Sequence, residues 1–234
     1  MRRRAANVTW LASVLASAAL IFGAETAGIP PGVEAEADYS FAEVIQRTTG
    51  HKVITSNPAN EAHATLLVRL KEAAAQAARS ARAAKIDKAR ANEVGNAIES
   101  HVLKALNDAG LVAQRPQTTG GRAQAAGYPD VEIASTPPCY LELKTYNART
   151  ADSTQRTFYY SPSELTKVTH DALHLLLAFE MEQRGKGDQT MWLPVRFKIV
   201  SLHDLKVRLK IEYNQSNRGL YTTERLLADE LVKE

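Results

Sequence analysis

The order of apolar and polar residues changes character midway along the chain. Over residues 60–109, apolar side chains recur at helical spacing in a stretch rich in Ala, Leu, Lys, Arg and Glu and free of proline. Gly95 is a candidate break in this stretch, and Gly110 is a candidate C-terminal stop. A shorter helix is predicted over residues 40–48, before Gly50. The first half of the chain is therefore expected to be helical.

Beyond Pro129 the spacing becomes that of β-strands. Residues 130–135 and 139–146 alternate polar and apolar side chains, and the Ser-Thr-Pro-Pro sequence at their junction predicts a turn. The two runs are therefore expected to form a hairpin. A turn centred between residues 136 and 137 places Asp130 opposite Leu143 on the neighbouring strand.

Three further segments have clear patterns. Residues 167–185 contain an apolar run that predicts a core-facing helix. Residues 191–202 and 205–213 alternate and predict two more strands, and residues 222–234 predict a closing helix. The fold class expected from these elements is α/β, with a mixed central sheet flanked by helices and a helical N-terminal half.

The N-terminal segment, residues 1–33, resembles a secretory signal. Three arginines precede an uncharged run from Trp10 to Phe22, which is too short to span a bilayer. A cleavable signal, a buried helix and a start codon placed too far upstream, with Val33 as the true start, all remain open. The rest divides into a helical region, 34–114, and a sheet region, 115–234, of one domain.

Composition adds little to this picture. The chain of 234 residues is 44% hydrophobic and 24% charged, as expected for a folded globular protein. Its formal charge of +3 tilts it only weakly toward polyanionic partners. Cys139 is the single cysteine, which excludes an intrachain disulfide.

The predicted hairpin carries three charged residues where apolar ones would be simpler. Glu142 and Lys144 share one face of their strand, and either can approach Asp130 from the neighbouring strand. Two carboxylates held together repel each other unless a cation compensates, and Mg²⁺ accepts one or two carboxylates with several waters. An adjacent lysine can orient a water and stabilise charge on phosphorus. The set suits phosphodiester hydrolysis, while an exposed hairpin with cross-strand ion pairs is the alternative.

These residues resemble the PD-(D/E)xK motif of restriction-endonuclease-like nucleases. Pro129-Asp130 is followed by eleven residues and then by Glu142-Leu143-Lys144. The upstream sequence EVGNAIESHV is similar to the helix that places a further glutamate beside the metal in many of these enzymes, with Glu99 at the matching position. The resemblance implies that Asp130, Glu142 and Glu99 bind Mg²⁺ and that Lys144 is the catalytic lysine. Glu93 and Glu132 are reserve acids.

The resemblance also implies a substrate. A compact chain without helicase or methyltransferase modules favours a type II restriction endonuclease that cuts double-stranded DNA as a homodimer. Repair nucleases and junction resolvases share the motif and remain alternatives. We expect a cytoplasmic enzyme with no membrane segment in its mature form, although the signal-like N-terminus leaves a secreted or periplasmic protein open.

The segment after the motif lysine is the expected DNA-contacting region. It is polar and carries side chains that bind base edges and phosphates, namely Tyr146, Asn147, Arg149, Gln155 and Arg156. An ordinary surface loop is the alternative. Farther along, Arg196 and Lys198 share a strand face that either is solvated or faces the DNA backbone.

A rival site lies at His170-Asp171-x-x-His174. On a helix, the two histidines would lie on one face, as in the HExxH zinc proteases. Together with the signal-like start, this pattern makes a secreted zinc metallohydrolase the second hypothesis. Asp171 is shorter than the usual glutamate, and only His203 or Glu212 offers a third ligand.

Overall fold

The computed structural model describes residues 38–87, 91–123, 127–152, 158–163, 165–185, 190–208 and 216–231. All of them lie in the unit that spans residues 34–234. The strands are β1 (Asp38–Ser40), β2 (Val53–Ile54), β3 (Ala113–Gln114), β4 (Val131–Ile133), β5 (Cys139–Asn147), β6 (Ala172–Arg184), β7 (Met191–Ser201) and β8 (Lys206–Arg208). The helices are α1 (Phe41–Thr49), α2 (Glu61–Ala84), α3 (Ala91–Asp108), the 3₁₀ turn η1 (Ala148–Thr150) and α4 (Asn217–Leu220).

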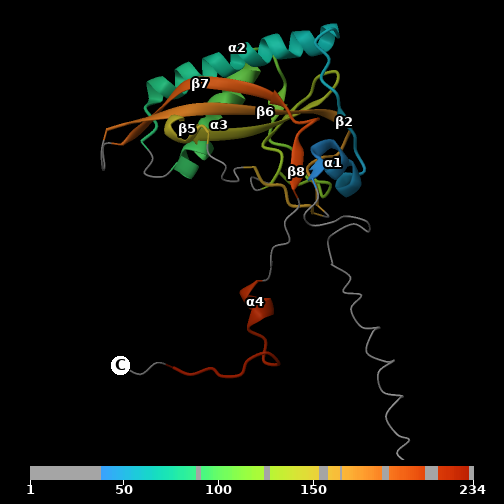
Figure 1. Cartoon of the computed structure of the whole chain (residues 1–234), viewed down its shortest axis with the longest axis vertical. Coiled ribbons are helices and arrows are strands. Elements are labelled where there is room, and N and C mark those ends of the chain that lie inside the picture. The colour runs from blue at the N-terminus through green and yellow to red at the C-terminus, as the bar shows by residue number, and fades with distance from the viewer. Residues whose placement is uncertain are drawn as a thin grey trace, which may run out of the picture. The chain divides into compact units, whose positions relative to one another are not determined.

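A mixed six-stranded sheet is the centre of the fold (Figure 1). Its order is β2-β6-β5-β4-β3, and β7 also pairs with β6. β5 and β2 run parallel to β6, whereas β7 is antiparallel to it, and β4 is antiparallel to both β3 and β5. β1 and β8 form a separate two-stranded sheet. This arrangement confirms the expected α/β class with a mixed sheet flanked by helices.

One face of the sheet is covered by a layer of helices. α2 packs on α3 and on β7, and α3 packs on β5. The apolar stripe of α3, including Val94, Ile98 and Val102, is buried against residues such as Leu141 and Leu143 of β5. The helix pattern of the sequence therefore reflects a stripe that faces a sheet.

The opposite face has a smaller aromatic cluster at one end. Phe41 at the start of α1 packs edge-on against Tyr128 and contacts the His174 ring, and Tyr140 lies beside the same histidine. Ser40 caps α1 by accepting a hydrogen bond from the Glu43 amide. The cluster fixes the chain just before Asp130 to the middle of the sheet.

The long predicted helix is two helices, but its division was placed wrongly. α2 ends at Ala84, and Lys85 adopts a left-handed conformation with φ of 53°. Next to it, Ile86 is buried and bridges to Trp192 of β7, so a tertiary contact and not a glycine sets the break. Gly95 lies inside α3, where the helix passes Thr145 of β5. Gly110, with φ of 76°, follows α3 as predicted.

The prediction of a helix over residues 167–185 was wrong, because most of this segment is β6. The strand is paired on both edges and runs between β5 and β7. A strand buried in this way has a nearly continuous apolar sequence, so the run Leu-His-Leu-Leu-Leu-Ala-Phe lost the alternation that marks strands.

The C-terminal helix predicted over residues 222–234 is also absent from the part that the structure describes, 222–231. A single turn, α4, precedes that segment. Leu227 is 101% exposed and Leu231 is 94% exposed, so these apolar side chains pack on nothing in the part of the chain that the structure describes. For the predicted strand 205–213, residues 206–208 form β8, and residues 209–213 lie outside the described residues.

The described helices include none that is long and apolar enough to cross a membrane.

Candidate active site

The predicted hairpin is present, with its register shifted by one residue. Val131 pairs with Leu141 and Ile133 with Cys139, because the turn is centred on Thr136. Continuing this register puts Asp130 level with Glu142 and not, as predicted, opposite Leu143. Cross-strand partners share a face, so the correction places the two carboxylates on the same face of the sheet.

Asp130 lies where β4 stops pairing with β5. Its Oδ2 accepts a hydrogen bond of 2.8 Å from the Leu143 amide. If β4 were longer, one of its backbone carbonyls would accept a hydrogen bond near this position. The aspartate side chain takes that place and satisfies the Leu143 amide at an open strand edge. That bond fixes the carboxylate beside β5.

Glu142 and Lys144 project together from β5. Lys144 Nζ donates a hydrogen bond to Glu142 Oε1, and the Lys144 ammonium lies 6.0 Å from the centre of the Phe158 ring. Glu142 is only 4% exposed, and its Oε2 is buried without a hydrogen-bond partner among the described residues. A buried carboxylate oxygen of this kind is costly unless another group binds it.

The surroundings of the two carboxylates make both of them harder to ionise. Burial, followed by repulsion from Asp130, raises the pKa of Glu142 to about 7 against the opposing effect of Lys144. Burial also raises the pKa of Asp130, and the Leu143 hydrogen bond and the Lys144 charge oppose this increase. A carboxyl group whose pKa lies near neutrality inside a charged cluster is typical of a functional site.

Glu99 lies at the border of this cluster. It is on α3, and its Oε1 accepts a hydrogen bond of 2.6 Å from Arg115 Nε. Its charge contributes to the raised pKa of Asp130. Within the described part of the chain, no three His, Cys, Asp or Glu side chains come together in a group able to hold a metal. The structure therefore brings Asp130, Glu142 and Lys144 together directly and leaves Glu99 paired with arginine.

Lys167 is a member of the cluster that the sequence did not reveal. It is 4% exposed, and its Nζ donates hydrogen bonds to Gly127 O at 2.7 Å and to Pro129 O at 3.0 Å. Burial lowers the pKa of Lys167, and Asp130, Glu142 and Glu99 oppose that change. One buried ammonium group thus holds the loop that leads to Asp130 and adds positive charge beside the carboxylates. No sequence signal distinguishes this lysine, which lies more than twenty residues beyond the motif.

The histidine pair of the zinc hypothesis does not lie on a helix. His174 is in β6 and is 1% exposed, and its Nδ1 hydrogen-bonds with Tyr128 Oη at 2.6 Å. Burial lowers the pKa of His174 to about 3, so the ring is neutral. His170 stacks on Tyr140 and lies 3.3 Å from Glu132. These contacts make the histidines part of the aromatic cluster that supports Asp130, and they do not favour the zinc alternative.

The two reserve acids have other surroundings. Glu93 is exposed on the first turn of α3. Glu132 accepts a hydrogen bond of 3.5 Å from Gln114 and pairs with His170.

Three of the five predicted DNA-contacting residues fall in the described residues. Tyr146 Oη donates a hydrogen bond to Glu180 at 3.0 Å. Asn147 caps η1 by accepting a bond from the Arg149 amide, and the Arg149 side chain is exposed. Gln155 and Arg156 lie outside the described residues.

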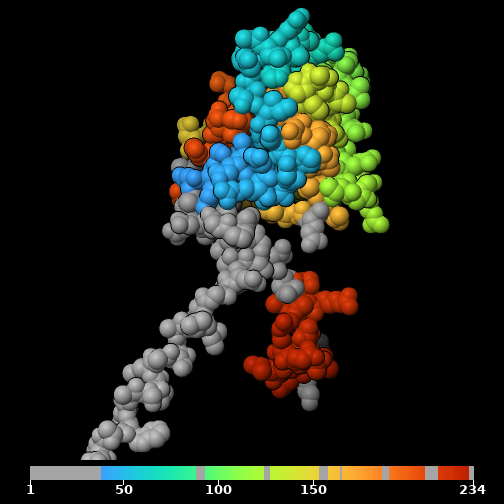
Figure 2. Space-filling model, turned by 90° about the vertical axis from the view of Figure 1, so that its right-hand side faces the viewer, coloured from blue at the N-terminus to red at the C-terminus, as the bar shows by residue number. Residues whose placement is uncertain are grey.

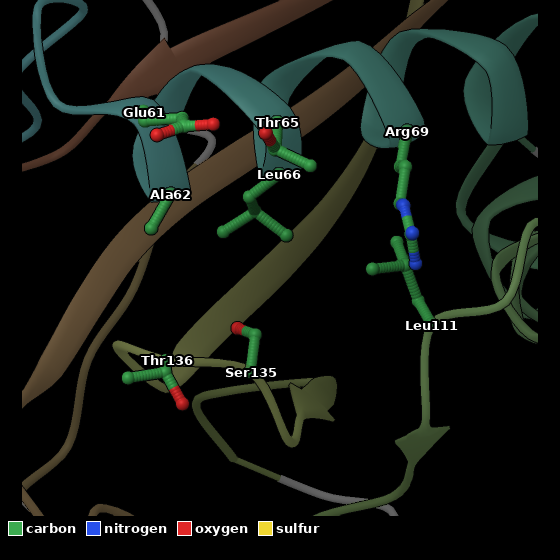
Figure 3. Close-up of a pocket in the computed structure, with 8 residues that line it drawn as sticks. All are labelled: Glu61, Ala62, Thr65, Leu66, Arg69, Leu111, Ser135 and Thr136. Carbon is green, nitrogen blue, oxygen red and sulfur yellow. The ribbon is translucent and has the colours of Figure 1, made fainter.

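A pocket of about 430 Å³ lies apart from these charges (Figure 3). Its walls come from the first turns of α2, from Leu111 and from the β4–β5 turn at Ser135 and Thr136. Figure 2 shows that turn, in yellow-green, beside the start of α2, in cyan. The pocket contains none of the residues predicted to act in catalysis, and its size alone gives it no chemical role.

Replacing Glu142 with Gln is expected to stabilise the metal-free protein at alkaline pH. Because folding raises the pKa of Glu142 from 4.5 to about 7, the folded state holds a proton that the unfolded state releases. The resulting loss in the free energy of unfolding is absent below pH 4.5 and grows as the pH rises to 7. Above pH 7 it is constant, at about 3 kcal/mol. Urea unfolding in chelator should show a gain for Glu142→Gln at pH 8 and none at pH 4. The exposed Glu72→Gln is the control, and an equal gain at both pH values contradicts the assignment.

The charge of Lys167 can be tested by a double-mutant cycle. Lys167→Met should lower the free energy of unfolding by about 3 kcal/mol, because two hydrogen bonds from a buried cation are lost. The cost should be smaller by at least about 0.5 kcal/mol in a Glu142→Gln background, where one of the facing charges is already gone. Strictly additive effects in the cycle would show that Lys167 only holds the loop.

Comparison with known proteins identifies the family of this chain. Residues 34–224 match the family model of the type II restriction enzyme MjaV family. The type II restriction enzyme MjaV of Methanocaldococcus jannaschii is 38% identical over 154 residues, which cover 62% of this chain and 65% of that protein. This chain thus aligns with slightly less than two thirds of the relative's length, and no solved structure matches it. Since the family match covers most of the chain and includes the Asp130–Glu142 cluster, the chain belongs to the type II restriction enzyme MjaV family.

Proposed function

We propose that this protein is a type II restriction endonuclease that hydrolyses phosphodiester bonds in double-stranded DNA at a short specific site. The observation that carries the proposal is Glu142, a buried carboxylate with one oxygen left without a partner among the described residues, beside Asp130 and Lys144. Family membership supports the same function. A purely structural ion pair would not require a buried acid with a pKa near neutrality.

The residues have separable tasks in this proposal. Asp130 is held in place by the Leu143 amide, and Glu142 by Lys144, so both carboxylates are oriented before substrate arrives. Lys144 is only partly buried, and its ammonium can position the attacking water and stabilise negative charge that develops on the phosphate. Glu99 is proposed as an auxiliary acid whose negative charge is partly offset by Arg115.

Mg²⁺ is the cofactor that these residues fit. It prefers oxygen ligands and usually takes one or two carboxylates while keeping several waters, and Asp130 and Glu142 offer that donor set. Glu142 Oε2, which is buried without a partner in the described ranges, is the atom best suited to a cation. When bound, the ion supplies positive charge that permits both carboxylates to ionise and that activates water and phosphate. Asp130, Glu142 and Glu99 are the proposed ligands.

The DNA partner is expected to contact the segment that follows Lys144. Tyr146, Asn147, Arg149, Gln155 and Arg156 remain the proposed contacts, with Arg149 exposed in η1, directly after β5. A homodimer is proposed because a twofold protein presents the same surface to both halves of a palindromic site. A cytoplasmic location is also proposed, since such an enzyme acts on DNA that has entered the cell.

The central test is cleavage of plasmid DNA. The wild-type protein should give discrete fragments with Mg²⁺ and no cleavage in chelator, whereas a smear would indicate a general nuclease. Asp130→Asn and Lys144→Ala should each lower the rate by at least about 100-fold, because each removes a group that acts on the transition state. Both variants should keep the wild-type circular dichroism spectrum.

Glu99→Ala should also reduce cleavage, whereas Glu93→Ala, an exposed change on the same helix, should leave it unchanged. Full activity in Asp130→Asn or Lys144→Ala would exclude the proposed site. Absence of cleavage by the wild-type protein on several plasmids would instead reject the proposed function.

A further inference from the structure

The face of the sheet that bears Glu142 continues beyond the site onto β6 and β7. Cross-strand partners share a face, and the register gives two successive rows: Lys144, Ala178 and Lys198, followed by Tyr146, Glu180 and Arg196. α2 and α3 pack on the other face, against the alternate residues of the same strands. The row that contains the proposed catalytic lysine therefore ends in a second lysine on β7.

A hydrogen-bonded pair fixes the cations of β7 near β5. Tyr146 Oη donates a hydrogen bond of 3.0 Å to Glu180 Oε2, and Arg196 Nε lies 3.7 Å from the same oxygen. Lys198 Nζ lies 5.1 Å from the centre of the Tyr146 ring, within the range of a cation–π contact. Both cations of β7 are thus directed toward the side of the sheet that bears Lys144.

These two cations remain accessible. The Arg196 side chain is 67% exposed, Lys198 is exposed, and the neighbouring Val200 on the same face is also exposed. Glu180 is largely covered, so the exposed charged groups on this face of β7 are the two cations. A surface of this sign beside a phosphodiesterase site complements a polyanion.

We propose that Lys198 and Arg196 on β7 hold backbone phosphates of the same duplex whose scissile phosphate lies at Asp130, Glu142 and Lys144. The proposal rests on the proposed nuclease function and adds a docking surface to it. Tyr146 and Glu180 act as positioning residues, since they hold the two cations beside the site. These contacts set where the duplex lies and carry no base specificity.

The spacing of the strands suits this role. Lys144 and Lys198 are two strands apart, which separates their Cα atoms by about 10 Å at about 4.8 Å per strand. DNA rises about 3.4 Å per base pair along its axis, so this distance equals the axial rise of about three base pairs. The catalytic lysine and the β7 lysine can therefore contact phosphates of one duplex a few nucleotides apart.

The test is the salt dependence of DNA binding and the kinetics of cleavage. Binding of a labelled plasmid fragment would be measured in chelator over a range of KCl concentrations for the wild type, Lys198→Gln and Arg196→Gln. Each substitution should reduce the slope of log Kd against log salt by about 0.9, because one phosphate contact is lost. Lys71→Gln is the matched control, since Lys71 is an exposed lysine on α2, the helix that covers the other face.

Cleavage with Mg²⁺ supplies a second measurement. Lys198→Gln and Arg196→Gln should raise KM for DNA several-fold and leave kcat within about twofold of wild type, because they act on binding and not on the reacting phosphate. Tyr146→Leu removes the ring under Lys198. Like the two β7 variants, it should reduce the salt slope and raise KM.

The outcomes separate the two proposals. Wild-type cleavage combined with unchanged slopes and KM for all variants would overturn the docking surface and leave the nuclease function intact. A change in oligomeric state by light scattering, with unchanged DNA binding, would assign the β7 face to a protein interface instead. A wild type that neither binds nor cuts DNA would overturn both.

Discussion

The hydrogen bond from the Leu143 amide to Asp130 Oδ2 is the contact on which the rest of the site depends. β4 pairs with β5 only as far as Val131 and Leu141, and beyond that point the aspartate replaces a neighbouring strand. The bond both satisfies an open strand edge and fixes a carboxylate beside Glu142. A longer β4 would satisfy the same edge with backbone and would leave no acid there.

Support for that contact comes from the far side of the site. Lys167 binds two backbone carbonyls just before Asp130, and Tyr128 in the same loop hydrogen-bonds with buried His174 of β6. The loop is therefore tied to the central strand of the sheet at one end and to β5 at the other. This framework keeps the two carboxylates together despite their mutual repulsion, because each carboxylate accepts a hydrogen bond from its own donor.

The sequence predicted the meeting of Asp130, Glu142 and Lys144 better than the architecture around them. The hairpin and the helical stretch over residues 60–109 were predicted from local spacing. The meeting of Asp130, Glu142 and Lys144 was predicted from a short motif, because the motif residues are neighbours on paired strands. The strand β6 was mistaken for a helix, since a strand buried on both faces has no polar alternation to report. The register was wrong by one residue because an odd-length turn and an even-length turn are equally compatible with Ser-Thr-Pro-Pro.

Long-range partners were beyond the reach of local patterns. Lys167 enters the cluster only because the chain returns beside the Asp130 loop, and Arg115 reaches Glu99 from the far end of α3. The break between α2 and α3 likewise follows from the contact of Ile86 with Trp192, more than a hundred residues away. None of these pairings has a signature in the spacing of neighbouring residues.

Side chains alternate along β5, so the residues that pack in the core and the residues of the proposed site lie on opposite sides of one strand. Leu141 and Leu143 face the helical layer, whereas Glu142 and Lys144 face the side where substrate is expected. Exposed positions on the outer side, other than those of the site, can therefore change without disturbing the packed inner side. A one-residue slip of this strand would exchange the two sets and remove the core and the site in a single event.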